Sequence, residues 1–277
     1  MNGKGASART IAVCAVTTAL LLAVQAALSM VSGVELVTVF LLAFCYVYGA
    51  RCGCCVATAF SLLRCFLFGF YPDVILLYLI YYNAFALLFG TTGRRGGRAA
   101  AYVSPVVLLL LAAGALSLAL AGLPVSPLLW ERLLVALWAL FAVLCFLAAL
   151  SVLLLFLSGR GARIGREAAM CASLAAAMTV LFTLLSDVIT PLCYGWSADA
   201  ALGFFYTGFF AMIPQTLCAA VSVSLLFYPL EHAFSCALPA NRRKERARRI
   251  GADVSRKMGR RGQNAPSNDG RTQKDMV

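Results

Sequence analysis

Charged residues and histidine are scarce in this sequence. Only 12% of its 277 residues are charged and 62% are hydrophobic, whereas a soluble domain has about 25% charged and 45–50% apolar residues. This balance excludes an ordinary soluble globular domain. The single histidine, His232, excludes a His-Glu-x-x-His metal or protease site, because that pattern needs two histidines on one helix face.

The sequence also lacks a P-loop, the Gly-x-x-x-x-Gly-Lys-Ser/Thr segment that holds the phosphates of ATP. Its only Gly-Lys pair, Gly3-Lys4, lies in the N-terminal segment. The chain is therefore not expected to hydrolyse ATP through such a loop. An intramembrane protease would need a Ser–His or paired-Asp site, and neither is evident, so we predict that the chain is not an enzyme.

The 11 cysteines do not form a recognisable metal site. Cys52, Cys54 and Cys55 lie close together, but a structural zinc site needs four ligands in characteristic pairs, and no complementary pair exists. We interpret most of these cysteines as small apolar packing residues. No metal and no directly bound cofactor is predicted.

Long apolar stretches dominate what is present. A helix needs about 20 apolar residues to cross roughly 30 Å of hydrocarbon. The runs are continuous and rich in Leu and Ala, which favours helices over the alternating strands of a barrel. We predict an all-α, polytopic transmembrane bundle of about eight spans. They cover residues 10–31, 34–50, 52–70, 73–90, 101–121, 130–157, 168–190 and 203–230.

The charges predict how these spans are oriented. Positively charged loops stay on the cytoplasmic side of a membrane. With a cytoplasmic N-terminal tail (residues 1–9), every Arg cluster between spans falls on the cytoplasmic side, and most acids fall outside. Both termini are therefore predicted to be cytoplasmic. The cytoplasmic residues are Lys4, Arg9, Arg51, Arg94, Arg95, Arg98, Arg160, Arg163 and Arg166; the outer residues are Glu35, Asp73, Glu131, Arg132 and Asp199.

Residues 241–277 form a basic tail, with 12 Lys/Arg against 4 Asp/Glu. Its composition cannot bury enough apolar surface to fold alone. We interpret it as a topology anchor that contacts anionic lipid. It lacks the interleaved aromatic residues of a nucleic-acid-binding segment, so no nucleic-acid partner is predicted.

Polar residues inside the predicted spans are the candidate functional residues, because intramembrane charges are costly and usually functional. Arg64 lies about six residues, or roughly 9 Å, from the outer end of its span. It either extends its charge to the membrane surface, or binds an anion, or pairs with Glu35 or Asp187. Other polar and aromatic residues share the outer half and could form a small-molecule pocket with it. The predicted substrate-binding residues are Arg64, Glu35, Asp73, Tyr78, Tyr82, Asn83, Asp187 and Gln215.

Alanines repeat along the first span. Small residues at a spacing of about four allow another helix to approach closely. We predict a helix-docking surface there, formed by Ala8, Ala12, Ala15, Ala19 and Ala23.

Four stretches carry a resemblance to a known family. They are the alanine repeat of residues 8–27; residues 34–38 leading to Tyr48-Gly49-x-x-x-Gly53; residues 68–70 with 78–83; and residues 186–191 running on to 212–215. Together they resemble the substrate-binding S components of energy-coupling factor (ECF) transporters, over roughly residues 8–90 and 168–235. The usual six helices differ from the eight predicted here, and we interpret residues 101–157 as an inserted helical pair.

The resemblance implies a division of labour. An S component captures a vitamin or cofactor precursor outside the bacterial cytoplasmic membrane. It docks through its first helices on a transmembrane scaffold subunit, and a pair of ABC ATPases hydrolyses ATP to drive delivery into the cytoplasm. The alanine repeat would be the docking surface. The lack of a His-rich N-terminal segment argues against nickel or cobalt as substrate.

Two other classes remain open. A stand-alone permease would be expected to show inverted repeats and broken helices at the midplane, and no convincing internal repeat is found. A membrane assembly protein would hold other membrane proteins without binding a small molecule. Ligand binding therefore separates this class from the S-component interpretation.

Overall fold

The computed structural model describes residues 8–31, 36–95, 98–122, 127–158 and 163–238. Over these ranges it consists of helices and has no strand. Glu35 and the basic tail of residues 241–277 lie outside the described residues. The helices are α1 (Ala8–Leu28), α2 (Val37–Tyr48), α3 (Ala50–Phe68), α4 (Pro72–Arg95), α5 (Arg98–Ala121), α6 (Pro127–Ser158), α7 (Arg163–Tyr194) and α8 (Ala198–Ala237).

Six of these helices, α1, α3, α4, α6, α7 and α8, are long and apolar enough to cross a membrane. The prediction of a helical membrane bundle is confirmed at this level, and the chain is a multi-pass membrane protein by this criterion. The second predicted span is shorter than expected. Helix α2 has 12 residues, which at 1.5 Å per residue is about 18 Å, too short to cross the hydrocarbon core alone.

Helix α7 occupies the centre of the bundle. It packs against α4, α5, α6 and α8, and every residue from Ala169 to Val180 is buried. Large apolar side chains on the outer helices are exposed instead, for example Phe146 on α6 (61%) and Phe210 on α8 (62%). Apolar side chains are therefore found both in the core and on the outside of the bundle. Exposed apolar patches of this extent mark an interaction surface, and lipid chains would cover them.

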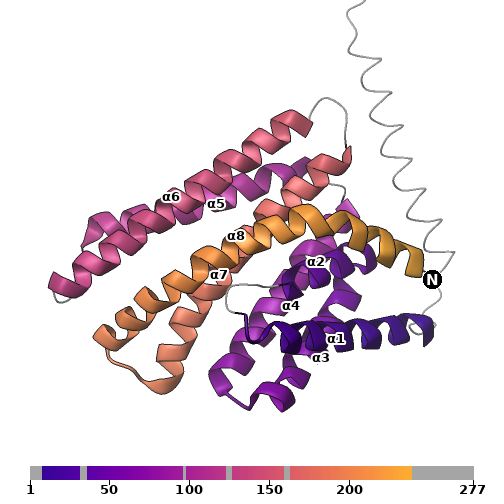
Figure 1. Ribbon diagram of the computed structural model, residues 1–277, viewed down its shortest axis with the longest axis horizontal. Coiled ribbons are helices and arrows are strands. Elements are labelled where there is room, and N and C mark those ends of the chain that lie inside the picture. Colours follow the sequence, from indigo (N-terminus) through magenta and orange to yellow (C-terminus); the bar gives the residue numbers. More distant parts are fainter. Residues whose placement is uncertain (1–7, 32–35, 96–97, 123–126, 159–162, 239–277) are drawn as a thin grey trace, which may run out of the picture. The chain divides into compact units, whose positions relative to one another are not determined.

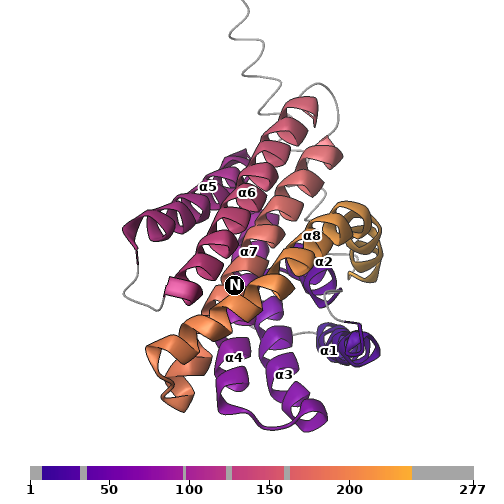
Figure 2. The ribbon, with the colours of Figure 1, turned by 60° about the vertical axis from the view of Figure 1, so that its left-hand side comes forward.

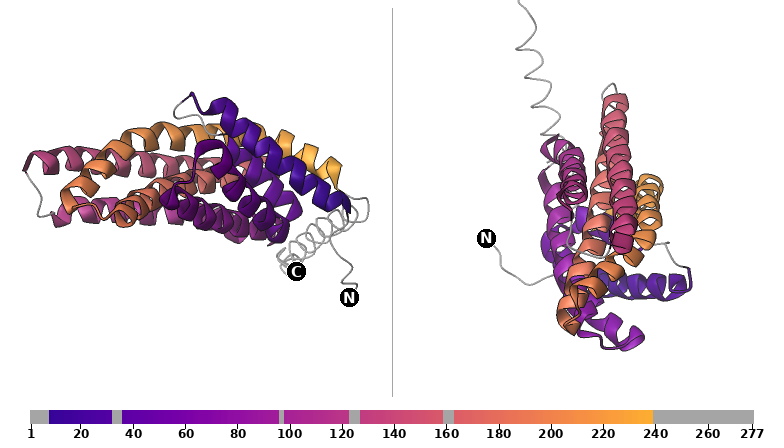
Figure 3. Two further views of the ribbon diagram at one scale, coloured as in Figure 1. Left: turned by 90° about the horizontal axis from the view of Figure 1, so that it is seen from below. Right: turned by 90° about the vertical axis from the view of Figure 1, so that its left-hand side faces the viewer.

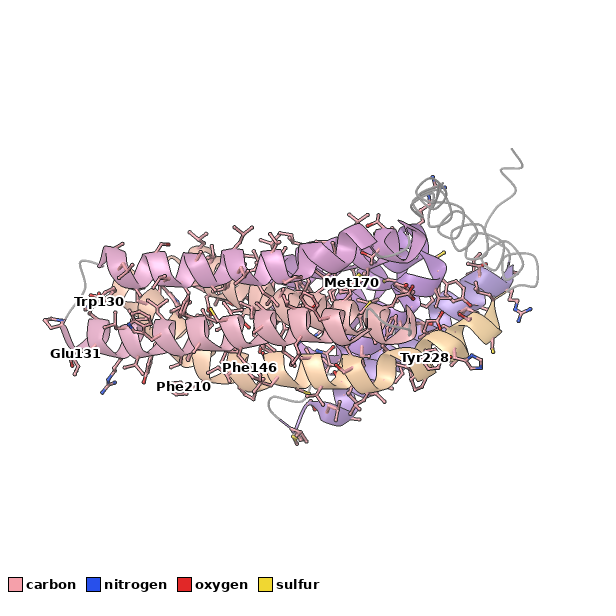
Figure 4. The ribbon with its side chains drawn as sticks, turned by 90° about the horizontal axis from the view of Figure 1, so that it is seen from above. Trp130, Glu131, Phe146, Met170, Phe210 and Tyr228 are labelled. Atoms are coloured by element: carbon pink, nitrogen blue, oxygen red, sulfur yellow. The ribbon has the colours of Figure 1, made fainter. Side chains whose placement is uncertain are left out.

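Residues 101–157, the predicted inserted pair, form α5 and α6, which lie side by side (Figure 1). Both also pack against α7, and α6 packs against α8. Leu108 of α5, Leu144 of α6 and Phe209 of α8 belong to one buried cluster. Figure 4 shows Trp130 and Glu131 at one end of α6, with Met170 of α7 toward the opposite end. The pair therefore shares a hydrophobic core with α7 and α8.

The N-terminal helices form a second group of contacts within the bundle. Helix α3 lies beside α4 (Figure 2), and α2 packs between α4 and α8. Helix α1 contacts α3 and α2 and lies at the periphery (Figures 2 and 3). It buries Thr10, Thr17, Thr18 and Leu21.

The end of α4 meets the corner between α2 and α3 without intervening side chains. A Cβ atom at Gly90 would overlap the backbone nitrogen of Ala50, and one at Gly93 would overlap the carbonyl oxygen of Tyr46. The corner itself turns at Gly49, whose φ of 83° favours glycine. These glycines allow the backbones of three helices to approach closely, as small residues do in membrane bundles.

A Gly90→Ala substitution tests this contact. The added methyl group must displace backbone atoms, so we expect a loss of stability of about 1–3 kcal/mol, the usual cost of overpacking. Gly114→Ala on α5 is the matched control, because a Cβ there meets nothing within 4 Å. Thermal unfolding in detergent, followed by circular dichroism, should show a lower midpoint for the first variant alone. Equal midpoints would contradict the interpretation.

Candidate functional site

Tyr78 of α4 is the centre of a polar and aromatic cluster. Because α3 and α4 lie side by side, Arg64 of α3 reaches across and places its guanidinium carbon 4.2 Å from the centre of the Tyr78 ring. The same carbon is 5.0 Å from the ring of Phe68, one turn further along α3. A cation over an aromatic face is attracted by the ring's quadrupole, and the attraction strengthens where water is excluded.

Gln25 of α1 joins this cluster from a third helix. Its Nε2 donates a hydrogen bond to the Tyr78 hydroxyl at 3.2 Å. Gln25 is not among the residues predicted from the sequence. The available signal was a lone amide in the apolar second half of α1, a residue that is costly to bury without a partner.

Aromatic rings enclose the other sides of Tyr78. The ring centres of Tyr82, Phe182 and Phe60 lie 5.0, 5.8 and 6.3 Å from that of Tyr78. Tyr78 is 8% exposed and Tyr82 is 1% exposed. We refer to Gln25, Phe60, Arg64, Phe68, Tyr78, Tyr82 and Phe182 as the Tyr78 cluster.

Two buried polar atoms in the Tyr78 cluster lack a hydrogen-bond partner. They are Nε of Arg64 and Oε1 of Gln25. A buried polar atom without a partner costs about 1–3 kcal/mol. Both side chains are half-buried, and both contact Tyr78, Arg64 at its ring and Gln25 at its hydroxyl.

Of the two acids predicted to pair with Arg64, Glu35 lies outside the described residues, and Asp187 makes another contact, as does the predicted substrate-binding residue Asp73. The Asp187 carboxylate of α7 lies against Gly208 of α8, where a Cβ would be 3.0 Å from Oδ1. Asp73, in the first turn of α4, accepts hydrogen bonds from Thr190 at 3.1 Å and from Tyr194 at 3.2 Å. Within the described residues, neither acid forms an ion pair with Arg64.

Asn83 and Gln215 also lie apart from the contacts of Arg64. Asn83 accepts a hydrogen bond from Thr58 at 3.1 Å and donates to the carbonyl of Leu79 at 2.9 Å, so it links α3 to α4. Gln215 is half-buried on α8. The structure thus brings Arg64, Tyr78 and Tyr82 together and places Asp73 and Asn83 in contacts between helices.

The predicted docking residues share one property. All five alanines of α1 are exposed, on the side away from the buried threonines. The exposed residues are Ala8, Ala12, Ala15, Ala19 and Ala23.

An open hollow lies at the start of α8. It is lined by Trp196, Phe204, Thr207 and two small residues, Ala200 and Gly203. Trp196 stacks on Tyr194 with ring centres 6.2 Å apart. Over the described ranges, no group of three or more His, Cys, Asp or Glu side chains is arranged to hold a metal ion.

Comparison with protein-family models, with curated proteins and with solved structures finds no match to this chain.

Replacing Asp73 tests its role between α4 and α7. Asp73→Ala removes two hydrogen bonds between α4 and the end of α7, so we expect a loss of about 1–3 kcal/mol at about 0.5–1.5 kcal/mol for each bond. Asp199→Ala is the matched control, because Asp199 is also in the first turn of a helix but is exposed. Thermal unfolding in detergent should separate the two variants. If Asp73→Ala unfolds at the wild-type midpoint, the carboxylate does not hold these helices together.

Proposed function

We propose that this chain is the substrate-binding subunit of an ECF-type ABC importer. It captures a small molecule, of the vitamin or cofactor-precursor class, outside the bacterial cytoplasmic membrane. A transmembrane scaffold subunit and a pair of ABC ATPases then drive its delivery to the cytoplasm. In this proposal all eight helices belong to the membrane-embedded body, and both termini are cytoplasmic.

The observation that carries the proposal is the contact of Arg64 with Tyr78. A cation, an amide and several aromatic rings from α1, α3, α4 and α7 meet in the Tyr78 cluster. Small-molecule sites combine apolar and aromatic walls with a few convergent polar groups, and an intramembrane charge of this kind is a functional-site candidate. The cluster therefore supports a binding function for the outer half of the bundle.

The peripheral position of α1 supports the second part of the proposal. Its buried side packs on α3 and α2, while its alanine side is exposed. Exposed small residues let a partner helix approach to backbone distance. We propose that the scaffold subunit docks on this side, and that ATP hydrolysis belongs to the partner ATPases because the chain has no P-loop.

Arg64→Ala tests the binding site. If Arg64 holds an anionic group, the variant should bind a small molecule that co-purifies with the wild-type chain more weakly. The expected loss is about 1.5–3 kcal/mol, the range for hydrogen bonds to charged groups. Arg51→Ala on the same helix is the control, because Arg51 is exposed. Calorimetric titration of the purified variants measures the change. Unchanged affinity with reduced expression would assign Arg64 a structural role.

Ala19→Leu tests the docking side. The larger side chain obstructs close helix approach, so we expect less scaffold subunit and ATPase to co-purify with the variant, while its unfolding midpoint stays unchanged because Ala19 is exposed. Ala19→Ser keeps a small side chain and should assemble normally. Undiminished co-purification with Ala19→Leu would sink the docking assignment.

A further inference from the structure

The hollow at the start of α8 is a second candidate binding site, apart from the Tyr78 cluster. Its volume is about 390 Å³, and small-molecule sites measure about 300–1,000 Å³. The rings of Trp196 and Phe204 meet edge to face there, with their centres 5.3 Å apart. Trp196 is 41% exposed, and a Cβ at Gly203 would meet nothing within 4 Å. The lining is therefore aromatic and open to a ligand.

The connection between α7 and α8 holds Trp196 in place (Figure 1). The chain turns at Gly195, whose φ of 62° favours glycine, and the Trp196 N–H donates a hydrogen bond to the carbonyl of Pro191 at 3.0 Å. This is the glycine turn that ends many helices. On the other side, the Ser197 hydroxyl accepts a hydrogen bond from the Ala200 N–H at 3.4 Å and caps α8. A ring whose backbone is fixed in this way loses little freedom when a ligand binds.

The charges around the hollow are negative. Asp199 lies in the first turn of α8 and is exposed, next to Ala200 of the lining. Asp73 accepts a hydrogen bond from the hydroxyl of Tyr194, whose ring stacks on Trp196. Among the described residues that line the hollow, none is basic. A cation is therefore favoured there, whereas a phosphate or carboxylate would be repelled.

The two helix ends at this point act on a cation in opposite directions. The N-terminal end of α8 carries a partial positive charge, and the C-terminal end of α7 carries a partial negative charge. Asp199 offsets the charge of the α8 end, because a carboxylate in the first turn complements the helix dipole. The side-chain charges therefore decide the sign of the preferred ligand.

Alkylammonium groups match both the rings and the charge. Aromatic faces attract cations, and quaternary ammonium groups are recognised by groups of such rings. Their methyl groups also pack on the apolar surface of Trp196 and Phe204. We propose that the hollow binds a small, soluble organic cation with an alkylammonium group. This site is additional to the proposed importer function and does not depend on it.

Choline is the probe for this proposal. Its neutral match is 3,3-dimethyl-1-butanol, in which a carbon atom replaces the ammonium nitrogen. Trp196 reports binding in the full chain with Trp130→Phe and Trp138→Phe, because the chain has three tryptophans. In detergent, choline should change the Trp196 emission saturably. The neutral alcohol should bind about 2–5-fold more weakly, the value of an exposed cation–π contact.

Three further substitutions in this background locate the response. Gly203→Leu places a side chain in open space, so it should abolish the choline response without lowering the unfolding midpoint. Gly114→Leu on α5 is the matched control, because a Cβ there also meets nothing within 4 Å, and it should respond normally. Asp199→Asn keeps the size of the side chain and removes its charge, so choline binding should weaken while binding of the alcohol stays the same.

Four results overturn the proposal. They are an equal response to sodium chloride, an equal affinity for the neutral alcohol, an unchanged response in Gly203→Leu, and loss of the response in Gly114→Leu. Vesicles of phosphatidylglycerol with and without phosphatidylcholine test the source of the cation. A choline response that phosphatidylcholine removes shows that a lipid headgroup occupies the hollow, and it overturns the soluble ligand. Arg64→Ala should leave the response intact, since Arg64 belongs to the Tyr78 cluster.

Discussion

The backbone contact between the end of α4 and the α2–α3 corner is the constraint on which the candidate site depends. Gly90 and Gly93 leave no room for a side chain between α4 and the backbone of Tyr46 and Ala50. This contact fixes α3 and α4 side by side at one end. Their remaining length can then bring residues of the two helices into register.

Side-chain hydrogen bonds further along hold α4 against both α3 and α7. Asn83 of α4 bonds to Thr58 of α3, and Asp73 at the start of α4 bonds to the end of α7. Helix α4 is thus held along its length, which keeps Tyr78 beneath Arg64 and against Phe182. A binding site needs this kind of support, because the groups that contact a ligand must be held by their neighbours.

Much of the fold was predictable from the sequence because hydropathy and charge act along the chain. Lipid excludes unsatisfied backbone groups, so each long apolar run becomes a helix, and the predicted spans agree with the helices to within a few residues at most ends. Helix α2 also ends close to its predicted span, yet it is too short to cross the membrane. A 12-residue helix that is nearly all buried in protein has the same apolar composition as part of a lipid-facing span. Composition reports burial, but it does not distinguish protein from lipid.

The site was only partly predictable for a related reason. Arg64 and the tyrosines stand out as polar residues in apolar runs, and the structure joins them. Asp187 and Asp73 stand out equally, yet they make separate contacts, because hydropathy gives the depth of a residue but not the neighbour that its helix face meets. Gln25 was missed because no pattern surrounds it; its bond to Tyr78 depends on how α1 packs on α3.

The energetics of Arg64 bear on the binding role proposed for it. Placing an arginine at the centre of a membrane helix costs about 2.5–3.5 kcal/mol on insertion scales, and less near an end. Arg64 lies four residues before the end of α3, about 6 Å along the axis. The cation–π contact with Tyr78 returns about 0.5–2 kcal/mol between exposed and desolvated limits, so it offsets part of this cost. The proposed binding role would account for a charged residue at a position where an apolar one costs less.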